Sequence, residues 1–235
     1  MIPRIIHQTS KVREIPSTWS AYQQRVRALH DGWEYHHWTD QENRELVQRS
    51  VPRWLPLYDS LALPIMKADM IRYVYMLVSG GLYLDFDFEF IKTFDLLDRS
   101  LVVPRQSDDD RPLGLGNAVL ASEPGHPFWE AVLEELAHRV HQLGRKPLED
   151  EIVETTGPGL LTAVYLRNPG RYPDLYSGRR EQFNPSVFNE EERAALFRSG
   201  RTYGIHHTDG TWRAKTLTQR AARKLATMAS RRRKK

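Results

Sequence analysis

The sequence contains no cysteine among its 235 residues. This absence excludes a disulfide framework, a cysteine nucleophile and thiolate metal ligands, and it is compatible with a reducing compartment. There is also no apolar run of about 18 residues, the length of a membrane-spanning helix, so we expect no transmembrane segment. Residues 1–10 lack the apolar core of a secretory signal, so we expect no signal peptide. Hydrophobic residues make up 40% of the chain, which is typical of a folded globular domain.

Acidic residues are missing from the segment between Arg213 and Lys235, which carries ten lysines and arginines. Because the whole chain has a net charge of +4, residues 1–212 together carry −6. The two parts therefore need separate explanations. We expect one acidic domain over residues 1–212 and a basic tail over residues 213–235.

The basic tail has apolar residues at helical spacing, at positions 217, 221, 225 and 228. This spacing predicts a helix with a thin apolar stripe, and one interpretation is a helix that lies on an anionic membrane surface. The alternatives are a helix packed on the acidic domain and a frayed tail. Nucleic-acid binding is disfavoured, because the tail has no aromatic residue for base stacking and the domain is acidic.

Short apolar runs alternate with helical periodicity along residues 1–212. The pattern predicts strands over residues 2–7, 33–38, 82–90, 101–104 and 117–121, with further strand candidates at 183–188 and 202–207. It predicts helices over residues 17–30, 40–50, 65–79, 127–143 and 158–166, the second of them capped by Thr39 or Asp40. Residues 51–64 and 167–180 are expected to form loops. This alternation predicts an α/β fold with a mainly parallel sheet.

The most informative segment is the predicted strand over residues 82–90. Side chains alternate between the two faces of a strand, so Asp85, Asp87 and Glu89 are expected on one face and the aromatic residues on the other. Three carboxylates side by side repel one another unless a cation lies between them, and Mn²⁺ or Mg²⁺ suits carboxylate oxygens. The alternative is an amphipathic strand whose acidic face is simply solvated.

The predicted helix over residues 65–79 is apolar except for a few positions that include Asp69 and Arg72. These two residues are three apart and therefore lie on one face of the helix. Gly80 and Gly81 end the helix and lead directly into the acidic strand, which indicates that the acids lie deep in the fold. Buried charges of this kind have either a functional task or a purely structural partner, and an Asp69–Arg72 ion pair is the structural alternative.

Several motifs occur together in a consistent order. They are Ile2–Gln8, Lys67–Tyr73 followed by Gly80–Asp87, Asn117-Ala118, Gly125–Phe128, Thr156-Gly157-Pro158 and His206–Trp212. In this combination residues 1–212 resemble glycosyltransferase family 32. That family comprises sugar-transferring proteins with a DXD motif, such as the yeast initiating α-1,6-mannosyltransferase and bacterial capsule and lipopolysaccharide enzymes.

The resemblance implies a single GT-A domain, a Rossmann-like sheet that binds a nucleotide-diphosphate sugar, and transfer with retention at the anomeric carbon. It implies Asp87 as a direct ligand of Mn²⁺ or Mg²⁺ and Asp85 as a ligand of the metal or of donor hydroxyls. Asp69 and Arg72 are implied to hold the donor sugar, so Asp69, Arg72 and Asp85 form the expected catalytic group. His207 has the spacing of a C-terminal metal ligand, and strand alternation would turn His206 away from the ion. The alternative for both histidines is a surface position near a turn.

The resemblance also implies further donor-binding residues, namely His7, Gln8, Asn117, Gly157, Pro158 and Trp212. A structural role is the alternative for His7, and strand or turn roles are the alternatives for Asn117 and the Gly157-Pro158 pair. One departure from the family is Ser10, where members often have a tryptophan that packs near the nucleotide base. Either Trp38 or another aromatic residue substitutes for it, or donor affinity is low.

These observations lead to three hypotheses. The first is a metal-dependent retaining hexosyltransferase that uses a UDP- or GDP-sugar and a glycan or lipid-linked acceptor in bacterial surface polysaccharide synthesis, such as capsule or lipopolysaccharide. It would be cytoplasmic and peripheral at the inner face of the membrane, and it would not bind nucleic acid. The second is a nucleotide-sugar-binding protein of the same fold that has lost catalysis, suggested by Ser10. The third is a nucleic-acid or membrane adaptor whose acidic strand is only structural.

Overall fold

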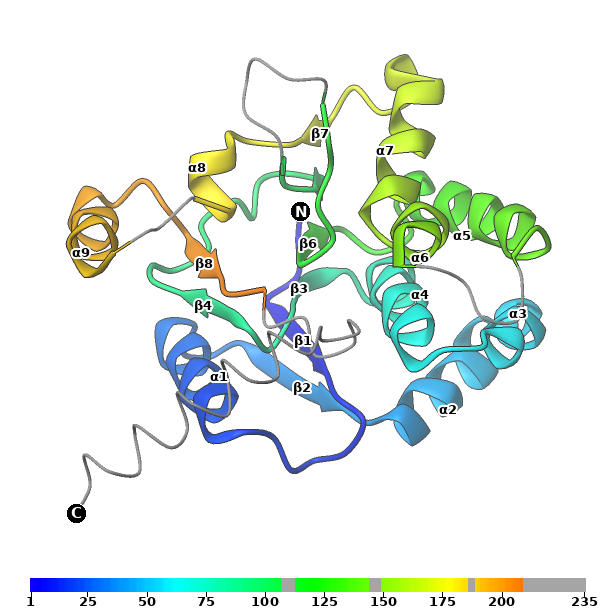
Figure 1. The fold of residues 1–235 in the computed structure, drawn as a ribbon, viewed down its shortest axis with the longest axis horizontal. Coiled ribbons are helices and arrows are strands. Elements are labelled where there is room, and N and C mark those ends of the chain that lie inside the picture. Colours follow the sequence, from blue (N-terminus) through cyan, green and yellow to red (C-terminus); the bar gives the residue numbers. More distant parts are fainter. Residues whose placement is uncertain (107–112, 144–148, 186–188, 209–235) are drawn as a thin grey trace.

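The computed structural model describes residues 1–106, 113–143, 149–185 and 189–208 (Figure 1). The N-terminal half contains β1 (Ile5–Thr9), α1 (Ser17–Leu29), β2 (Glu34–Trp38), α2 (Asp40–Ser50), η1 (Pro52–Trp54), α3 (Leu55–Ser60), α4 (Pro64–Val78), β3 (Gly81–Leu84), β4 (Phe88–Phe90) and β5 (Leu101–Val102). The C-terminal half contains β6 (Val119–Ser122), α5 (Pro127–Val140), α6 (Glu149–Thr155), α7 (Pro158–Arg167), η2 (Pro169–Arg171), β7 (Leu175–Tyr176), α8 (Arg180–Phe183), α9 (Glu190–Ser199) and β8 (Gly204–His206).

Six strands form the central sheet, in the order β2-β1-β3-β6-β5-β7. The pairs β1–β2, β1–β3 and β5–β7 are parallel, whereas β3–β6 and β5–β6 are antiparallel. Parallel pairing therefore predominates, and the predicted α/β class with a mainly parallel sheet is confirmed. The strands β4 and β8 form a separate antiparallel pair beside α1 and α9 (Figure 1).

Alternating side chains of the central strands supply two hydrophobic clusters, one on each face of the sheet. Tyr83 and Leu120 belong to the cluster that contains α4, α5 and α7. Leu82 and Ala121 belong to the other cluster, which contains residues of α1 and β4. The sheet is thus covered on both sides, as parallel strands require.

Two glycines join α4 to β3 in a tight turn. Gly80 has a φ of +62° and Gly81 a φ of +93°, a region that side chains with a Cβ rarely adopt. A Cβ on Gly81 would lie 2.5 Å from the carbonyl oxygen of Ile5 in β1. The predicted helix end at this pair is confirmed, and the turn brings α4 and the acidic segment into one place.

The predicted continuous strand over residues 82–90 is wrong. The chain leaves the central sheet after Leu84, turns through residues 85–87 and starts the separate strand β4 at Phe88. A hydrogen bond of 3.1 Å from the amide of Phe88 to the carbonyl of Asp85 closes this turn. The chain turns there because β4 pairs with β8 and not with the central sheet, so the three acids do not share one strand face.

Other expectations from the sequence differ at the level of elements. Residues 51–64 include the short helices η1 and α3, and part of the predicted strand at 183–188 is the end of helix α8, while residues 186–188 lie outside the described ranges. The strand at 202–207 is confirmed as β8. Helices α6 and α9 were not predicted, and α9 has no buried residue that would give it an apolar period.

The predicted tail over residues 213–235 and Trp212 lie outside the described residues, so the division at residue 212 stays a prediction. Among the helices of the described part, none combines the length and the apolar character that crossing a membrane requires.

Candidate functional site

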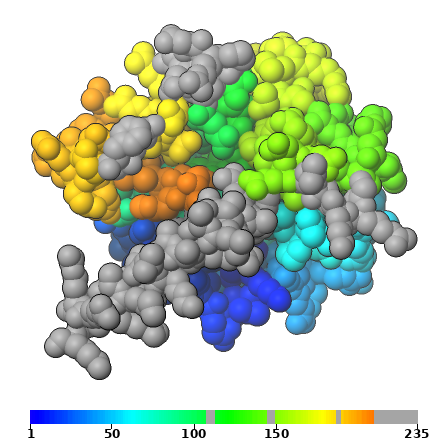
Figure 2. All heavy atoms as spheres, in the orientation of Figure 1, coloured from blue at the N-terminus to red at the C-terminus, as the bar shows by residue number. Residues whose placement is uncertain are grey.

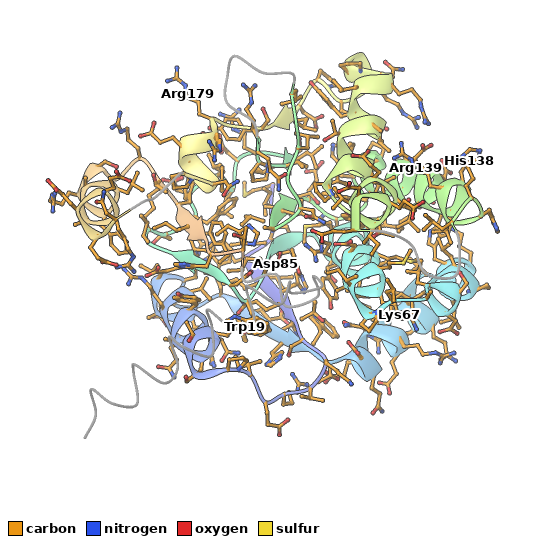
Figure 3. The ribbon with its side chains drawn as sticks, viewed as in Figure 1. Trp19, Lys67, Asp85, His138, Arg139 and Arg179 are labelled. Atoms are coloured by element: carbon orange, nitrogen blue, oxygen red, sulfur yellow. The ribbon has the colours of Figure 1, made fainter. Side chains whose placement is uncertain are left out.

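A cleft of about 470 Å³ lies at the carboxyl ends of β1 and β3, where α/β proteins commonly bind ligands. Asp85 marks its position near the centre of the molecule in Figure 3, with Trp19 of α1 close by in the same view. Figure 2 shows one face of the molecule, with the orange surface of β8 and the yellow-green surface of α7 on opposite sides of its centre. Its lining includes Trp19, Arg72, Asp85, Asp87, Asn117 and His206.

Asp85 stands directly after β3, held by its own neighbours. Its amide donates to the carbonyl of Ala118 over 2.9 Å, which fixes the backbone against β6. The hydroxyl of Tyr83 donates to its carboxylate, and Nη1 of Arg72 lies 3.3 Å from Oδ1. Asp85 is therefore oriented by protein groups from β3, α4 and the residue before β6.

Asp69 and Arg72 form a buried ion pair on α4, with Nη2 of Arg72 3.2 Å from Oδ1 of Asp69. Arg72 also donates to the carbonyl of Asn117 over 2.7 Å. Asp69 accepts hydrogen bonds from the Asn117 amide (2.9 Å) and the Thr156 hydroxyl (2.8 Å). The ion pair named as the structural alternative exists, and both of its members line the cleft.

Burial shapes the charges of this group. Loss of solvent raises the pKa of Asp69 to about 6, although Arg72 and the Thr156 hydroxyl favour its carboxylate form. Burial also raises the pKa of Asp85, against the opposing effect of Arg72. Buried carboxyls with raised pKa values that share one cleft are typical of functional sites.

Asp85, Asp87 and His206 are the residues that could hold a metal ion. One ligand atom from each lies within 4.8 Å of the other two, and no other such group exists among the residues that the structure describes. Nε2 of His206 is 3.3 Å from Oδ1 of Asp87 and 4.0 Å from Oδ2 of Asp85. Two carboxylates and one imidazole suit Mn²⁺, and three protein ligands leave room for further oxygen ligands.

The prediction that His207 is the metal-binding histidine is wrong. Nε2 of His207 lies 3.1 Å from Oε2 of Glu89, and its ring stacks on Tyr22 with 5.0 Å between the ring centroids. The register of β8 against β4 places His206 opposite Phe88 and turns its side chain to the acids. The expectation that only one of the two histidines faces the ion agrees with this geometry, but that histidine is His206.

Glu89 does not join the two aspartates, contrary to the prediction of a shared acidic face. Its side chain is only 4% exposed and interacts with Arg193 and His207. The aromatic residues Phe86, Phe88 and Phe90 are buried, as predicted.

Asn117, Gly157 and Pro158 line the cleft, as their predicted role requires. His7 and Gln8 are buried and do not line it, so the structure gives no support to their predicted contact with a donor. His7 donates from Nε2 to the carbonyl of Gly80 (3.0 Å) and accepts from Nε1 of Trp38 (3.1 Å), which confirms the structural alternative. Gln8 is fully buried and accepts a hydrogen bond of 2.7 Å from the Tyr35 hydroxyl.

The expectation built on Ser10 named Trp38 or another aromatic residue, and the structure places other aromatic residues in the cleft. The ring of Trp38 is stacked among His7, His36 and Tyr75 and does not line the cleft. Instead, Trp19 stacks on Phe86 with 5.9 Å between ring centroids, and both residues line the cleft. Sequence reasoning missed Trp19, because nothing in the periodicity of α1 distinguishes a cleft residue from a surface residue.

Residues 16–103 match the family described as glycosyltransferase sugar-binding region containing DXD motif. Inositol phosphoceramide mannosyltransferase 2 of Schizosaccharomyces pombe is 30% identical over 90% of this chain and 58% of its own length. Mannosyl phosphorylinositol ceramide synthase SUR1 of Saccharomyces cerevisiae is 36% identical over 59% of this chain and 35% of its own length. The chain thus spans about a third to three fifths of the length of these curated relatives.

Solved structures show the same fold at low identity. The PaToxG glycosyltransferase superposes with a TM-score of 0.54 at 13% identity, covering 72% of this chain and 70% of that one. The ligand-free glycosyltransferase domain of the YGT toxin gives a TM-score of 0.57 at 9% identity, covering 75% of this chain and 80% of that one. The predicted GT-A fold is confirmed by these similarities.

Proposed function

Because this chain belongs to the family of glycosyltransferases with a DXD-containing sugar-binding region, we propose that it transfers a hexose from a nucleotide-diphosphate sugar to a glycan or lipid-linked acceptor. We further propose that the transfer depends on a divalent cation and retains the anomeric configuration. The observation that carries this proposal is the convergence of Asp85, Asp87 and His206 in one cleft with the buried pair Asp69–Arg72.

In this proposal Asp85, Asp87 and His206 hold Mn²⁺ or Mg²⁺. A bound cation would neutralise the diphosphate and stabilise the charge that develops on the departing nucleotide. Arg72 holds Asp85 in place and supplies a fixed positive charge in the cleft. Asp69 orients Arg72 and Asn117, because its carboxylate forms an ion pair with Arg72 and accepts a hydrogen bond from the Asn117 amide.

No side chain of the described cleft is assigned as a nucleophile. Retaining transfer then proceeds by attack of the acceptor hydroxyl on the face that the nucleotide leaves. The bond from the anomeric carbon to the diphosphate oxygen breaks as the new glycosidic bond forms, and the hydroxyl proton passes to the departing diphosphate. Asp69, Arg72 and Asp85 form the catalytic group. The role of these residues is to position the donor and to stabilise charge, which is the larger part of catalysis in transfers of this kind.

Mannose is the first donor sugar to test, since the relatives named above are mannosyltransferases of inositol phosphoceramides. The acceptor panel should accordingly contain an inositol phospholipid. It should also contain lipid-linked bacterial glycans, because the acceptors of capsule or lipopolysaccharide synthesis are the other class in the proposal.

The test is donor hydrolysis and transfer over a panel of UDP- and GDP-sugars, with Mn²⁺ and with EDTA. Asp87→Ala and His206→Ala should each abolish the Mn²⁺-dependent rate. His138→Ala is the matched control, because His138 is an exposed histidine on α5 that Figure 3 shows well away from Asp85. Full activity of Asp87→Ala would sink the proposal, whereas donor binding without turnover over the whole panel would favour a binding protein that has lost catalysis.

We also propose that the protein works in the cytoplasm at an anionic membrane surface, with the basic tail as the contact. Each lysine or arginine near such a surface contributes about 1 kcal/mol. Flotation with vesicles of anionic lipid tests this for the full chain. Replacement of the five residues 231–235 by glutamine should release the protein from the vesicles, and unchanged flotation would refute the membrane contact.

A further inference from the structure

A buried carboxylate lies behind the proposed cation site and is not part of it. Glu89 of β4 is 3% exposed, and groups from three other parts of the chain surround it. Arg193 of α9 donates a hydrogen bond to its Oε1, and Nη1 of Arg25 of α1 lies 3.7 Å from the same atom. His207, directly after β8, lies 3.1 Å from Oε2.

The second feature is the way in which His207 is held. Its backbone amide donates to the carbonyl of Asp87 over 2.9 Å, its ring nitrogen meets Glu89, and its ring lies flat on Tyr22 with 5° between the planes. The neighbouring residue His206 points to the other side, toward Asp85 and Asp87. Any rotation of the chain at His207 therefore moves the His206 imidazole relative to the two acids.

The backbone alone gives this segment little support. The strand β8 has three residues, and within the described ranges it pairs only with the equally short β4. A two-stranded pair of this size is marginally stable by itself, so side-chain anchors decide how firmly its end is held. In the described part of the chain, Thr208 follows with a φ of 47°, which marks the end of the extended segment.

We propose that Glu89 is a positioning residue for the cation site. By binding the His207 imidazole it fixes the end of β8, so that His206 presents Nε2 to Asp85 and Asp87. The inference rests on the proposed function, because it assigns a role to residues behind that same site. A group that orients a metal ligand typically changes metal affinity by about 10- to 100-fold when it is removed.

Direct titration of the full chain with Mn²⁺ tests the proposal, using the electron paramagnetic resonance signal of free Mn²⁺. His207→Phe is the principal variant, because phenylalanine keeps a ring for Tyr22 and leaves the charge of Glu89 in place. We expect it to weaken Mn²⁺ binding by roughly 10-fold or more. His207→Gln retains a donor for Glu89 and should recover most of the affinity, and Glu89→Gln combined with His207→Phe should bind no more weakly than His207→Phe alone.

Arg193→Met is the matched control, because it removes another partner of the same carboxylate and leaves the His207 contact intact. It should lower the thermal midpoint and leave the Kd for Mn²⁺ within about twofold. Wild-type affinity of His207→Phe, or an equal loss in Arg193→Met, would overturn the positioning role and leave the cation site standing. Failure of the wild-type chain to bind Mn²⁺ would instead refute the cation site, and the positioning role with it.

Discussion

Replacement of Gly81 by alanine tests how the fold brings Asp85 and Asp87 to the cleft. Gly81 has a φ of +93°, and an added Cβ would lie 2.5 Å from the carbonyl oxygen of Ile5 and 3.0 Å from its Cβ. The positive φ alone costs an alanine about 1–2 kcal/mol, as for other residues in left-handed conformations. The close contact adds about 1–3 kcal/mol, as in overpacked cores, because the contacting atom is backbone and has no room to move.

The expected loss of unfolding free energy is therefore about 2–5 kcal/mol, measured by urea denaturation. The same Cβ would push β3 away from β1, and Asp85 follows β3 directly, so Mn²⁺-dependent activity should fall as well. Gly125→Ala is the matched control, since Gly125 has a φ of +72° and a Cβ there would meet nothing within 4 Å. It should lose only the conformational part, about 1–2 kcal/mol. Equal losses in the two variants would refute the argument from close approach.

Two further predictions follow from the buried polar groups. Burial lowers the pKa of His7 to about 3, so between that value and 6.5 the unfolded chain binds a proton that the folded chain does not. The free energy of unfolding should then fall as the pH falls through this window, by up to about 1.4 kcal/mol per pH unit. In urea titrations, His7→Gln should lose less unfolding free energy than the wild type between pH 7 and pH 5. An equal loss in both proteins would contradict it. Thr156→Val removes the hydroxyl that donates to Asp69 and should lower the free energy of unfolding by about 1–3 kcal/mol. Thr156→Ser keeps the hydroxyl and should behave as wild type. Equal stability of Thr156→Val and wild type would show that this hydrogen bond contributes nothing.

Local signals in the sequence predicted the helices whose bounds are set by residues within them or next to them. The helix over α4 is apolar on nearly every side and ends at two glycines, so its position followed from composition alone. The start of α2 was also predictable, because Thr39 accepts from the amide of Glu42 while the Glu42 side chain accepts from the amide of Thr39. Such reciprocal caps are written into four consecutive residues.

The shape of the acidic segment was not predictable in this way. An alternating pattern is the same in one long strand and in two strands joined by a turn, as at residues 85–87. The difference depends on β8, whose residues pair with β4 from more than 100 positions away. For the same reason, alternation could state that only one of His206 and His207 faces the acids, but the choice required the register of that distant pair.

The partners of Asp69 were hidden by the same distance, because Asn117 and Thr156 come from separate parts of the chain. Both residues had been singled out within motifs, yet their meeting at one carboxylate depends on how α4, β6 and α7 pack. Sequence motifs thus identified the residues, and only tertiary structure showed which of them contact the cleft. His7 and Gln8 illustrate the converse, since they belong to a motif and are buried behind the site.

Charge balance in the cleft explains why a cation and a diphosphate should bind together. Among the cleft residues that the structure describes, Asp69, Asp85, Asp87 and Arg72 together carry a net formal charge of −2, and His206 is a neutral ligand when it binds a metal. An anionic diphosphate is repelled by such a cleft, and one divalent cation neutralises it. Because Arg72 is already paired with Asp69 and Asp85, it cannot supply that neutralisation alone. In the proposed function the cation would therefore enter before the donor or with it, and we expect donor affinity measured without a divalent cation to be far weaker than with one.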